Sequence, residues 1–323
     1  MANPPELVVL CDDSRPSGME EVERLARVRY VQPAELPDAI GDADALFMWA
    51  FQSTALADAW PRAHRLQWVH TASAGVDRVL IPEVAKSDVV VTNSRGVFDD
   101  AIAEYVLGLV LLFAKGMHDT LARQRTRTWE HRDTEMVAGR SALVVGVGPI
   151  GRAVGRLLAA AGMHVSGVGR TARSEDPDFG TVLGSADLAD ALPAADYVVA
   201  VAPLTEETRG MFDAAAFARM RSTARFINVG RGPLVVERDL IAALREERIA
   251  GAGLDVFEEE PLSYDSPLWS MSNVVVSPHM SADYVGWLDT LARVFVDNFH
   301  RWHGGEELRN VVDKWLGYVP SAP

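Results

Sequence analysis

The sequence predicts an α/β protein with two doubly wound parallel sheets. Short β-rich runs alternate with amphipathic helical patterns, and this series occurs twice along the 323 residues. Several of the runs are continuously apolar rather than alternating, as expected for parallel strands that are buried on both faces. Hydrophobic residues make up 48% of the chain, which is enough to build two cores.

The β-rich runs give the expected strands in chain order. In the first series they lie at Glu6–Leu10, Ala45–Trp49, Leu66–Thr71 and Val89–Thr92. In the second series they lie at Ala142–Val147, His164–Val168, Tyr197–Ala202, Arg225–Val229, Gly251–Asp255 and Asn273–Val276. Amphipathic helices separate them, as in the apolar face that is formed by Val154, Leu157, Leu158 and Ala161.

A division into two domains follows from the point where the two series meet. The apolar helical stretch from about Ile102 to Gly116 would join them. The last helical stretch, from about Trp287 to Trp302, would return to the first domain. We therefore expect one domain from residues 1–98 and 287–323, and a second from residues 99–286.

The composition argues against several classes of partner. The net charge of −14 disfavours nucleic acid, because phosphate binding needs clustered Lys and Arg. Met1–Leu10 carries no basic region ahead of its short apolar run, so we expect no signal peptide. The most apolar stretch, Tyr105–Ala114, is too short to span a bilayer, so we expect no membrane partner. The only cysteine, Cys11, excludes an intrachain disulfide and fits a reducing cytoplasm.

A glycine-rich turn of the GxGxxG form occupies residues 146–151, between an apolar strand and an amphipathic helix. Gly146 permits the tight turn, Gly148 lets the backbone approach a pyrophosphate, and Gly151 lets the helix pack against the strand. The helix, which begins at about Pro149 and Ile150, then offers unpaired N–H groups to the phosphates. The turn therefore predicts dinucleotide binding, although a glycine-rich loop alone is a weak signal.

The strand after this turn ends at Gly169, where an NAD-binding domain usually carries an acidic residue for the ribose 2′-hydroxyl. Arg170, Thr171 and Arg173 follow, and two arginines can clamp a 2′-phosphate that a carboxylate would repel. The sequence therefore favours NADP(H). The alternative is NAD(H), served by Glu175–Asp176 if the loop doubles back, with both arginines as solvated surface residues.

Three later segments place reactive side chains at the ends of strands, where α/β sheets build their sites. Phe226–Pro233 carries Arg231, Gly251–Pro261 carries an aspartate and an acidic run, and Val276–His279 ends in histidine. No Cys/His cluster with metal-ligand spacing accompanies them, so we expect no metal.

These motifs, in this order, resemble the D-isomer-specific 2-hydroxyacid dehydrogenases. The resemblance covers nearly the whole chain, through Ser73–Asp77, Gly146–Gly151, Pro203–Thr205, the Arg231 segment, Asp255–Pro261 and Pro278–His279. It implies a Rossmann cofactor domain inserted in a flavodoxin-like substrate domain, and a homodimer formed through the cofactor domain. It also implies a catalytic triad of Arg231, Glu260 and His279. Gly169 followed by Arg170 is similar to the glyoxylate/hydroxypyruvate reductase branch.

The chemistry of a 2-oxo acid reduction suits the three residues of this triad. The carbonyl oxygen needs a proton, and histidine is the side chain that titrates closest to neutral pH, so His279 is the expected donor. Glu260 beside it would orient the ring and favour the imidazolium. Arg231 would bind the substrate carboxylate and stabilise developing negative charge. Glu260 also lies in an acidic run that could be a solvated loop.

Further contacts are expected around the triad. The resemblance implies cofactor contacts at Pro203, Thr208, Val229 and Asp255, the last to the nicotinamide amide. The Ser73, Ala74 and Gly75 turn would cradle the substrate carboxylate with backbone N–H groups, together with Arg231. Trp49 would shape the pocket for the substrate side chain. The turn could also be an ordinary strand-to-helix turn, and Trp49 could belong to the core.

The sequence thus predicts an NADPH-preferring enzyme that reduces small 2-oxo acids, such as glyoxylate or hydroxypyruvate, to D-2-hydroxy acids. One alternative is a cofactor-binding regulator or corepressor on the same fold, since fold does not dictate function. Another is an NAD-dependent dehydrogenase of the phosphoglycerate type, which the missing NAD-type acid disfavours. A formate dehydrogenase is disfavoured because that branch is expected to carry glutamine in place of Glu260.

Overall fold

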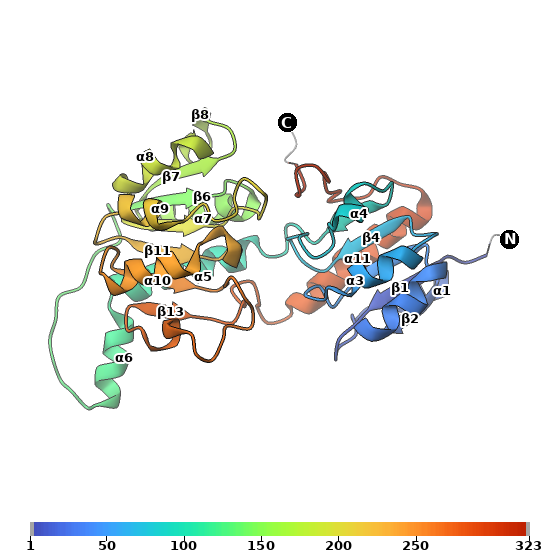
Figure 1. Cartoon of the computed structure of the whole chain (residues 1–323), viewed down its shortest axis with the longest axis horizontal. Coiled ribbons are helices and arrows are strands. Elements are labelled where there is room, and N and C mark those ends of the chain that lie inside the picture. The colour runs from blue at the N-terminus through green and yellow to red at the C-terminus, as the bar shows by residue number, and fades with distance from the viewer. Residues whose placement is uncertain (1–2, 321–323) are drawn as a thin grey trace. The chain divides into compact units, whose positions relative to one another are not determined.

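The computed structural model describes residues 3–320, which fold into two compact units (Figure 1). The residues up to Val97, together with those from Tyr284 onward, form unit 1, and Phe98–Asp283 forms unit 2. Each unit has its own parallel sheet with helices packed on it (Figure 1). The prediction of two doubly wound α/β domains is therefore confirmed.

The sheet of unit 1 has five parallel strands in the order β2-β1-β3-β4-β5, which is the flavodoxin order. Its strands are β1 Glu6–Leu10, β2 Arg27–Val31, β3 Ala45–Met48, β4 Trp68–Thr71 and β5 Val90–Asn93. The sequence pattern did not predict β2. This strand lies at the edge of the sheet and alternates basic with apolar residues, so it lacks the apolar run of a strand buried on both faces.

The helices of unit 1 pack on both faces of this sheet. They are α1 Glu20–Leu25, α2 Leu36–Ala39, α3 Ala55–Ala59, α4 Pro82–Ala85 and α11 Trp287–Gly304. Phe295 of α11 stacks on Phe47 of β3 at a centroid distance of 3.9 Å and on Trp68 of β4 at 5.4 Å. Leu46 and Val69 point to the opposite face and join the core beneath the other helices. Helix α11, near the C-terminus, thus packs on one face of a sheet whose strands come from the N-terminal part of the chain.

The sheet of unit 2 has eight strands in the order β13-β12-β11-β10-β6-β7-β9-β8. Its strands are β6 Ser141–Val145, β7 His164–Gly169, β8 Arg173–Asp176, β9 Gly180–Gly184, β10 Tyr197–Ala200, β11 Arg225–Asn228, β12 Gly251–Leu254 and β13 Val274–Val276. All pairs are parallel except β8 with β9. The succession from β9 through β7, β6, β10 and β11 to β12 is the Rossmann order, and the strand order reverses between β6 and β10 while the strands stay parallel.

The helices of unit 2 are α5 Asp99–Ala114, α6 Met117–Arg125, α7 Pro149–Ala160, α8 Leu188–Ala191, α9 Ala214–Arg219 and α10 Glu237–Arg245. Helices α5 and α7 pack closely together, and α8, α9 and α10 form a second group. Short 3-10 helices lie at Pro33–Glu35, Ile40–Asp42, Trp60–Arg62, Ser185–Asp187, Leu192–Ala194, Gly232–Leu234 and Pro267–Ser270. In residues 3–320 no single helix is long and apolar enough to cross a membrane, and only the bent pair α5–α6 meets those criteria jointly.

Candidate active site

The glycine turn lies at the carboxyl end of β6, beside the point where the strand order reverses. Gly146 has a φ of +112°, and a Cβ there would lie 2.5 Å from the Ala202 nitrogen. A Cβ on Gly151 would lie 1.8 Å from the Gly146 oxygen, so helix α7 approaches the turn too closely for any side chain. At Gly148 an added Cβ would meet no described atom within 4 Å. The turn therefore leaves open space at the amino end of α7, as a bound pyrophosphate requires.

The loops after β10 and β11 begin at the same edge of the sheet as the glycine turn, because the three strands are parallel. The Thr208 hydroxyl donates to the Pro203 carbonyl at 2.7 Å and accepts from the Thr205 N–H at 2.8 Å, which fixes the first loop. Val229 is buried, and its N–H donates to the Ala200 carbonyl at 3.1 Å. Pro203, Thr208 and Val229 thus lie at the edge that carries the glycine turn, and their contacts to a cofactor remain predictions.

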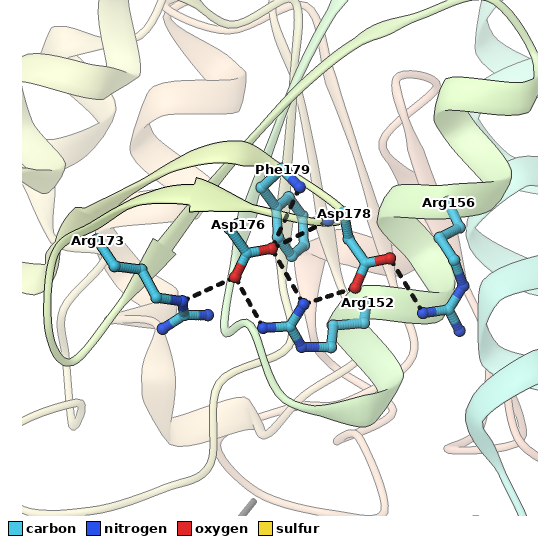
Figure 2. A network of polar contacts seen from close by, with 6 residues as sticks. All are labelled: Arg152, Arg156, Arg173, Asp176, Asp178 and Phe179. Atoms are coloured by element: carbon cyan, nitrogen blue, oxygen red, sulfur yellow. Dashed lines mark hydrogen bonds and ion pairs between the residues drawn. The ribbon is translucent and has the colours of Figure 1, made fainter. Parts of the chain in front are cut away.

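The residues expected at the cofactor's 2′ position follow β7. Arg170 and Thr171 are exposed beyond the end of this strand at Gly169. Arg173 begins β8, and its Nε donates to the Asp176 carboxylate at 2.7 Å (Figure 2). Asp176 is buried and fully engaged within the unit, so its carboxylate does not stand free to accept a ribose hydroxyl.

Arg231 lies in the loop after β11, and two close contacts set the position of this loop. The Asn228 side chain accepts from the Gly230 N–H at 3.1 Å and donates to the Arg231 carbonyl at 3.1 Å. A Cβ on Gly232 would lie 1.7 Å from the Phe257 oxygen. The loops after β11 and β12 therefore press together, and this brings Arg231 toward the segment that carries Glu260.

His279 and Glu260 form a direct pair. The His279 Nδ1 lies 2.7 Å from the Glu260 Oε2, and the Glu260 Oε1 accepts from the Phe257 N–H at 3.0 Å. Burial raises the pKa of Glu260, but hydrogen bonds from His279 and the Phe257 N–H, with the charges of His279 and Arg231, outweigh it and lower this pKa overall. Glu260 thus remains a carboxylate that holds Nδ1, which leaves Nε2 as the nitrogen that can exchange a proton with a substrate.

The turn that carries His279 has an unusual backbone. His279 has a φ of +53°, in the left-handed region that a residue other than glycine rarely adopts, at a cost of about 1–3 kcal/mol. The carboxylate of Asp255 holds the turn, because it accepts from the N–H groups of Met280 and Ser281, each at 2.9 Å. The Ser277 hydroxyl donates to the same carboxylate at 2.6 Å. Asp255 is fully buried, and these bonds give it a positioning role, while its contact to a nicotinamide amide remains a prediction.

In unit 1 the Ser73–Gly75 turn is fixed by hydrogen bonds to its carbonyl oxygens. The Ser73 hydroxyl donates to the Gly75 oxygen at 2.6 Å, and the Asn93 amide donates to the Ala74 oxygen at 2.6 Å. The Ser94 N–H donates to the Ser73 oxygen at 2.9 Å. The turn is thus rigid, as a backbone cradle for a carboxylate should be.

Trp49 lies beyond the end of β3 and is buried. Its indole N–H donates to the Ser14 hydroxyl at 3.2 Å, and its ring packs edge-on against Phe47 at 5.7 Å. These contacts are those of a core side chain, so a role in shaping a substrate pocket remains a prediction.

Comparisons with known proteins agree with this architecture. Residues 107–281 match the profile described as D-isomer specific 2-hydroxyacid dehydrogenase, NAD binding domain. A glyoxylate reductase from Thermococcus kodakarensis is 31% identical over 304 residues, which are 91% of this chain and 90% of that protein.

Two solved structures share the whole fold. A D-isomer specific 2-hydroxyacid dehydrogenase from Xanthobacter autotrophicus Py2, in complex with NADPH and MES, has a TM-score of 0.82 and 32% identity, over 98% of this chain and 100% of that chain. An NADPH-dependent glyoxylate/hydroxypyruvate reductase from Sinorhizobium meliloti, in complex with NADP and sulfate, has a TM-score of 0.82 and 29% identity, over 97% and 100%. The chain therefore belongs to the D-isomer-specific 2-hydroxyacid dehydrogenase family and is an oxidoreductase that binds a nicotinamide cofactor.

Proposed function

We propose that this chain is an NADPH-preferring reductase of small 2-oxo acids, with glyoxylate and hydroxypyruvate as the first substrates to test. The observation that carries the proposal is the His279–Glu260 pair at 2.7 Å, with the charge of Arg231 acting on the same carboxylate. A related glyoxylate reductase, and structural relatives in complex with NADPH or NADP, support the substrate class and the cofactor.

The residues of unit 2 divide the chemistry between them. The bound cofactor supplies the hydride for the carbonyl carbon. His279 donates a proton from Nε2 to the carbonyl oxygen, while Glu260 holds Nδ1 and keeps the ring in position. Arg231 binds the substrate carboxylate and stabilises the negative charge that develops on the oxygen. The product is then a 2-hydroxy acid, for which we propose the D configuration.

We propose for the binding residues the roles that the sequence predicts. We propose that Gly146, Gly148, Pro149, Ile150 and Gly151 hold the pyrophosphate at the amino end of α7. The 2′-phosphate would meet Arg170, Thr171 and Arg173. Ser73, Ala74, Gly75 and Trp49 are the proposed substrate contacts of unit 1.

A direct comparison of the two cofactors tests the preference for NADPH. Charge-assisted hydrogen bonds contribute about 1.5–3 kcal/mol each, so kcat/KM should be at least about tenfold higher with NADPH than with NADH. The oxidation rate of each cofactor would be followed with glyoxylate, hydroxypyruvate, pyruvate and phenylpyruvate. Arg170→Gln should reduce the preference, whereas Arg245→Gln, an exposed arginine in the last turn of α10, should not.

Two results would contradict parts of this proposal. A preference for NADH would overturn the role given to Arg170 and Arg173, and would leave the reaction class standing. Binding of NADPH with no turnover of any 2-oxo acid would favour a regulator or corepressor instead.

We infer a reducing compartment such as the cytoplasm, because the buried thiol of Cys11 is free.

We also infer that the chain forms a homodimer. Helix α6 buries none of its residues, and with the segment after it extends away from the sheet of unit 2 (Figure 1). Leu121 and Trp129 of this region are exposed apolar side chains, as are Met117 and Met136. A second copy would cover this surface.

Sedimentation velocity would measure the mass in solution. The wild type should sediment at about twice the 35.2 kDa of one chain. Trp129→Asp should shift the equilibrium toward the monomer, because it places a charge in the apolar contact. Trp315→Asp changes an exposed tryptophan of unit 1 and should leave the dimer intact. A wild type that remains monomeric at every concentration would contradict the inference.

A further inference from the structure

An ionic network built on one buried carboxylate, that of Asp176, lies beside the segment expected to bind the 2′-phosphate (Figure 2). Arg152 of α7 donates to both oxygens of Asp176, at 3.0 and 2.8 Å, and to Asp178 at 2.6 Å. The Asp176 side chain is only 1% exposed. Arg173 reaches the same carboxylate from the other side through Nε, at 2.7 Å (Figure 2). Arg152 and Arg173 therefore share one buried carboxylate.

Asp176 is held in its ionised form by these contacts. The hydrogen bonds from Arg152 are the main cause, and with those from Arg173 and the Asp178 N–H they outweigh burial and hold the pKa of Asp176 well below its usual range. Arg152 forms the stronger of the two ion pairs, because its fork meets both carboxylate oxygens, whereas Arg173 meets one. Arg152, which also pairs with Asp178, thus compensates the charge of Asp176 from the α7 side.

This compensation matters for what Arg173 can bind. Its bond to Asp176 uses Nε, so its two terminal nitrogens are the donors that an incoming phosphate would meet. Without Arg152, the negative charge of the Asp176 carboxylate would repel that phosphate. The carboxylate would also pair more strongly with the guanidinium of Arg173 and offset its positive charge.

We propose that Arg152 determines cofactor selectivity by neutralising Asp176. The positive charge of Arg173 then remains available to attract the 2′-phosphate of NADP(H). Arg152 acts here as a positioning residue through Asp176 and Arg173, and it does not touch the reacting atoms. This inference rests on the proposed preference for NADPH. It adds a residue of α7 that the chemistry of His279, Glu260 and Arg231 does not use.

The test measures the affinity for two ligands that differ only in the 2′-phosphate. Calorimetry would give the Kd of 2′,5′-ADP and of 5′-AMP, which needs no turnover. In Arg152→Met the affinity for 2′,5′-ADP should fall about 10–100-fold, while that for 5′-AMP should change less than about threefold. Adding Asp176→Asn to this variant removes the carboxylate charge and should restore most of the lost affinity.

A matched control lies one turn further along α7. Arg156 pairs only with Asp178 in Figure 2, at 3.3 Å, and its side chain is 57% exposed. Arg156→Met should therefore leave both affinities unchanged. Asp176→Asn alone covers the case in which Arg152→Met does not fold, because it keeps Arg152 and removes the carboxylate charge. Its affinity for 2′,5′-ADP should equal or exceed that of the wild type.

Several outcomes would overturn the proposal. Equal losses for both ligands in Arg152→Met would indicate a purely structural role. Failure of Asp176→Asn to restore affinity in the double variant, or a tenfold loss of 2′,5′-ADP affinity in Asp176→Asn alone, would exclude the neutralising role. If the wild type binds 2′,5′-ADP and 5′-AMP equally well, both this inference and the NADPH preference are overturned. If the wild type binds 2′,5′-ADP more tightly, the NADPH preference stands even where the variants contradict the role of Arg152.

Discussion

Replacement of His279 by alanine is expected to lower kcat about 10²–10⁴-fold, because the carbonyl oxygen then lacks its proton donor. The glycine turn lies in a separate loop, so the Kd for NADPH should change little. Stopped-flow and steady-state oxidation of NADPH with glyoxylate would measure the rate, and intrinsic fluorescence would measure binding.

The control is His164→Ala, which changes an exposed histidine at the start of β7 in the same unit. It should leave kcat unchanged. If His279→Ala retained more than about a tenth of the wild-type kcat, the proton donor would have to be another group.

Loss of Arg231 is expected to have the second large effect. Arg231→Met removes the proposed partner of the substrate carboxylate and a stabiliser of the oxyanion, so kcat should fall about 10²–10³-fold and KM should rise. Arg231→Lys keeps the charge but not the fork, so it should recover only part of kcat/KM. Initial rates over a range of glyoxylate concentrations would separate the two parameters.

An exposed arginine on α10 gives the control. Arg238 has a side chain that is 87% exposed, and Arg238→Met should behave as the wild type. A rise of KM in Arg231→Met with an unchanged kcat would show that Arg231 only binds the carboxylate and does not stabilise the transition state.

The sequence predicted the central strands of both sheets but not all of the edge strands. Central strands such as β6 and β10 are buried on both faces, so they appear as apolar runs. Strand β8 contains Arg173–Asp176 and no apolar residue, and β9 is only five residues long between glycines. Strand β9 has only Val182 and Leu183 as an apolar pair, so neither strand shows the longer apolar run of a strand buried on both faces.

In the candidate site, too, the sequence motifs predicted which residues matter, and the structure was needed to give their contacts. The motifs identified Arg231, Glu260 and His279 in the sequence, and the structure gives the 2.7 Å contact within that set. No local pattern indicated the left-handed backbone of His279, because bonds from residues 277–281 to Asp255 accompany it. The pairing of Arg152 with Asp176 was equally hidden, since 24 residues separate them in the chain.

The reversal of strand order between β6 and β10 has a consequence for divergence within such folds. The residues proposed to meet the 2′-phosphate of the cofactor follow β7 or begin β8 on one flank, whereas Arg231, Glu260 and His279 follow β11, β12 and β13 on the other. The glycine turn after β6 and the loop after β10 meet at the junction of the two flanks, where Gly146 lies against Ala202. A substitution on one flank therefore need not move the groups on the other, so we expect cofactor choice and reaction chemistry to vary separately in this architecture.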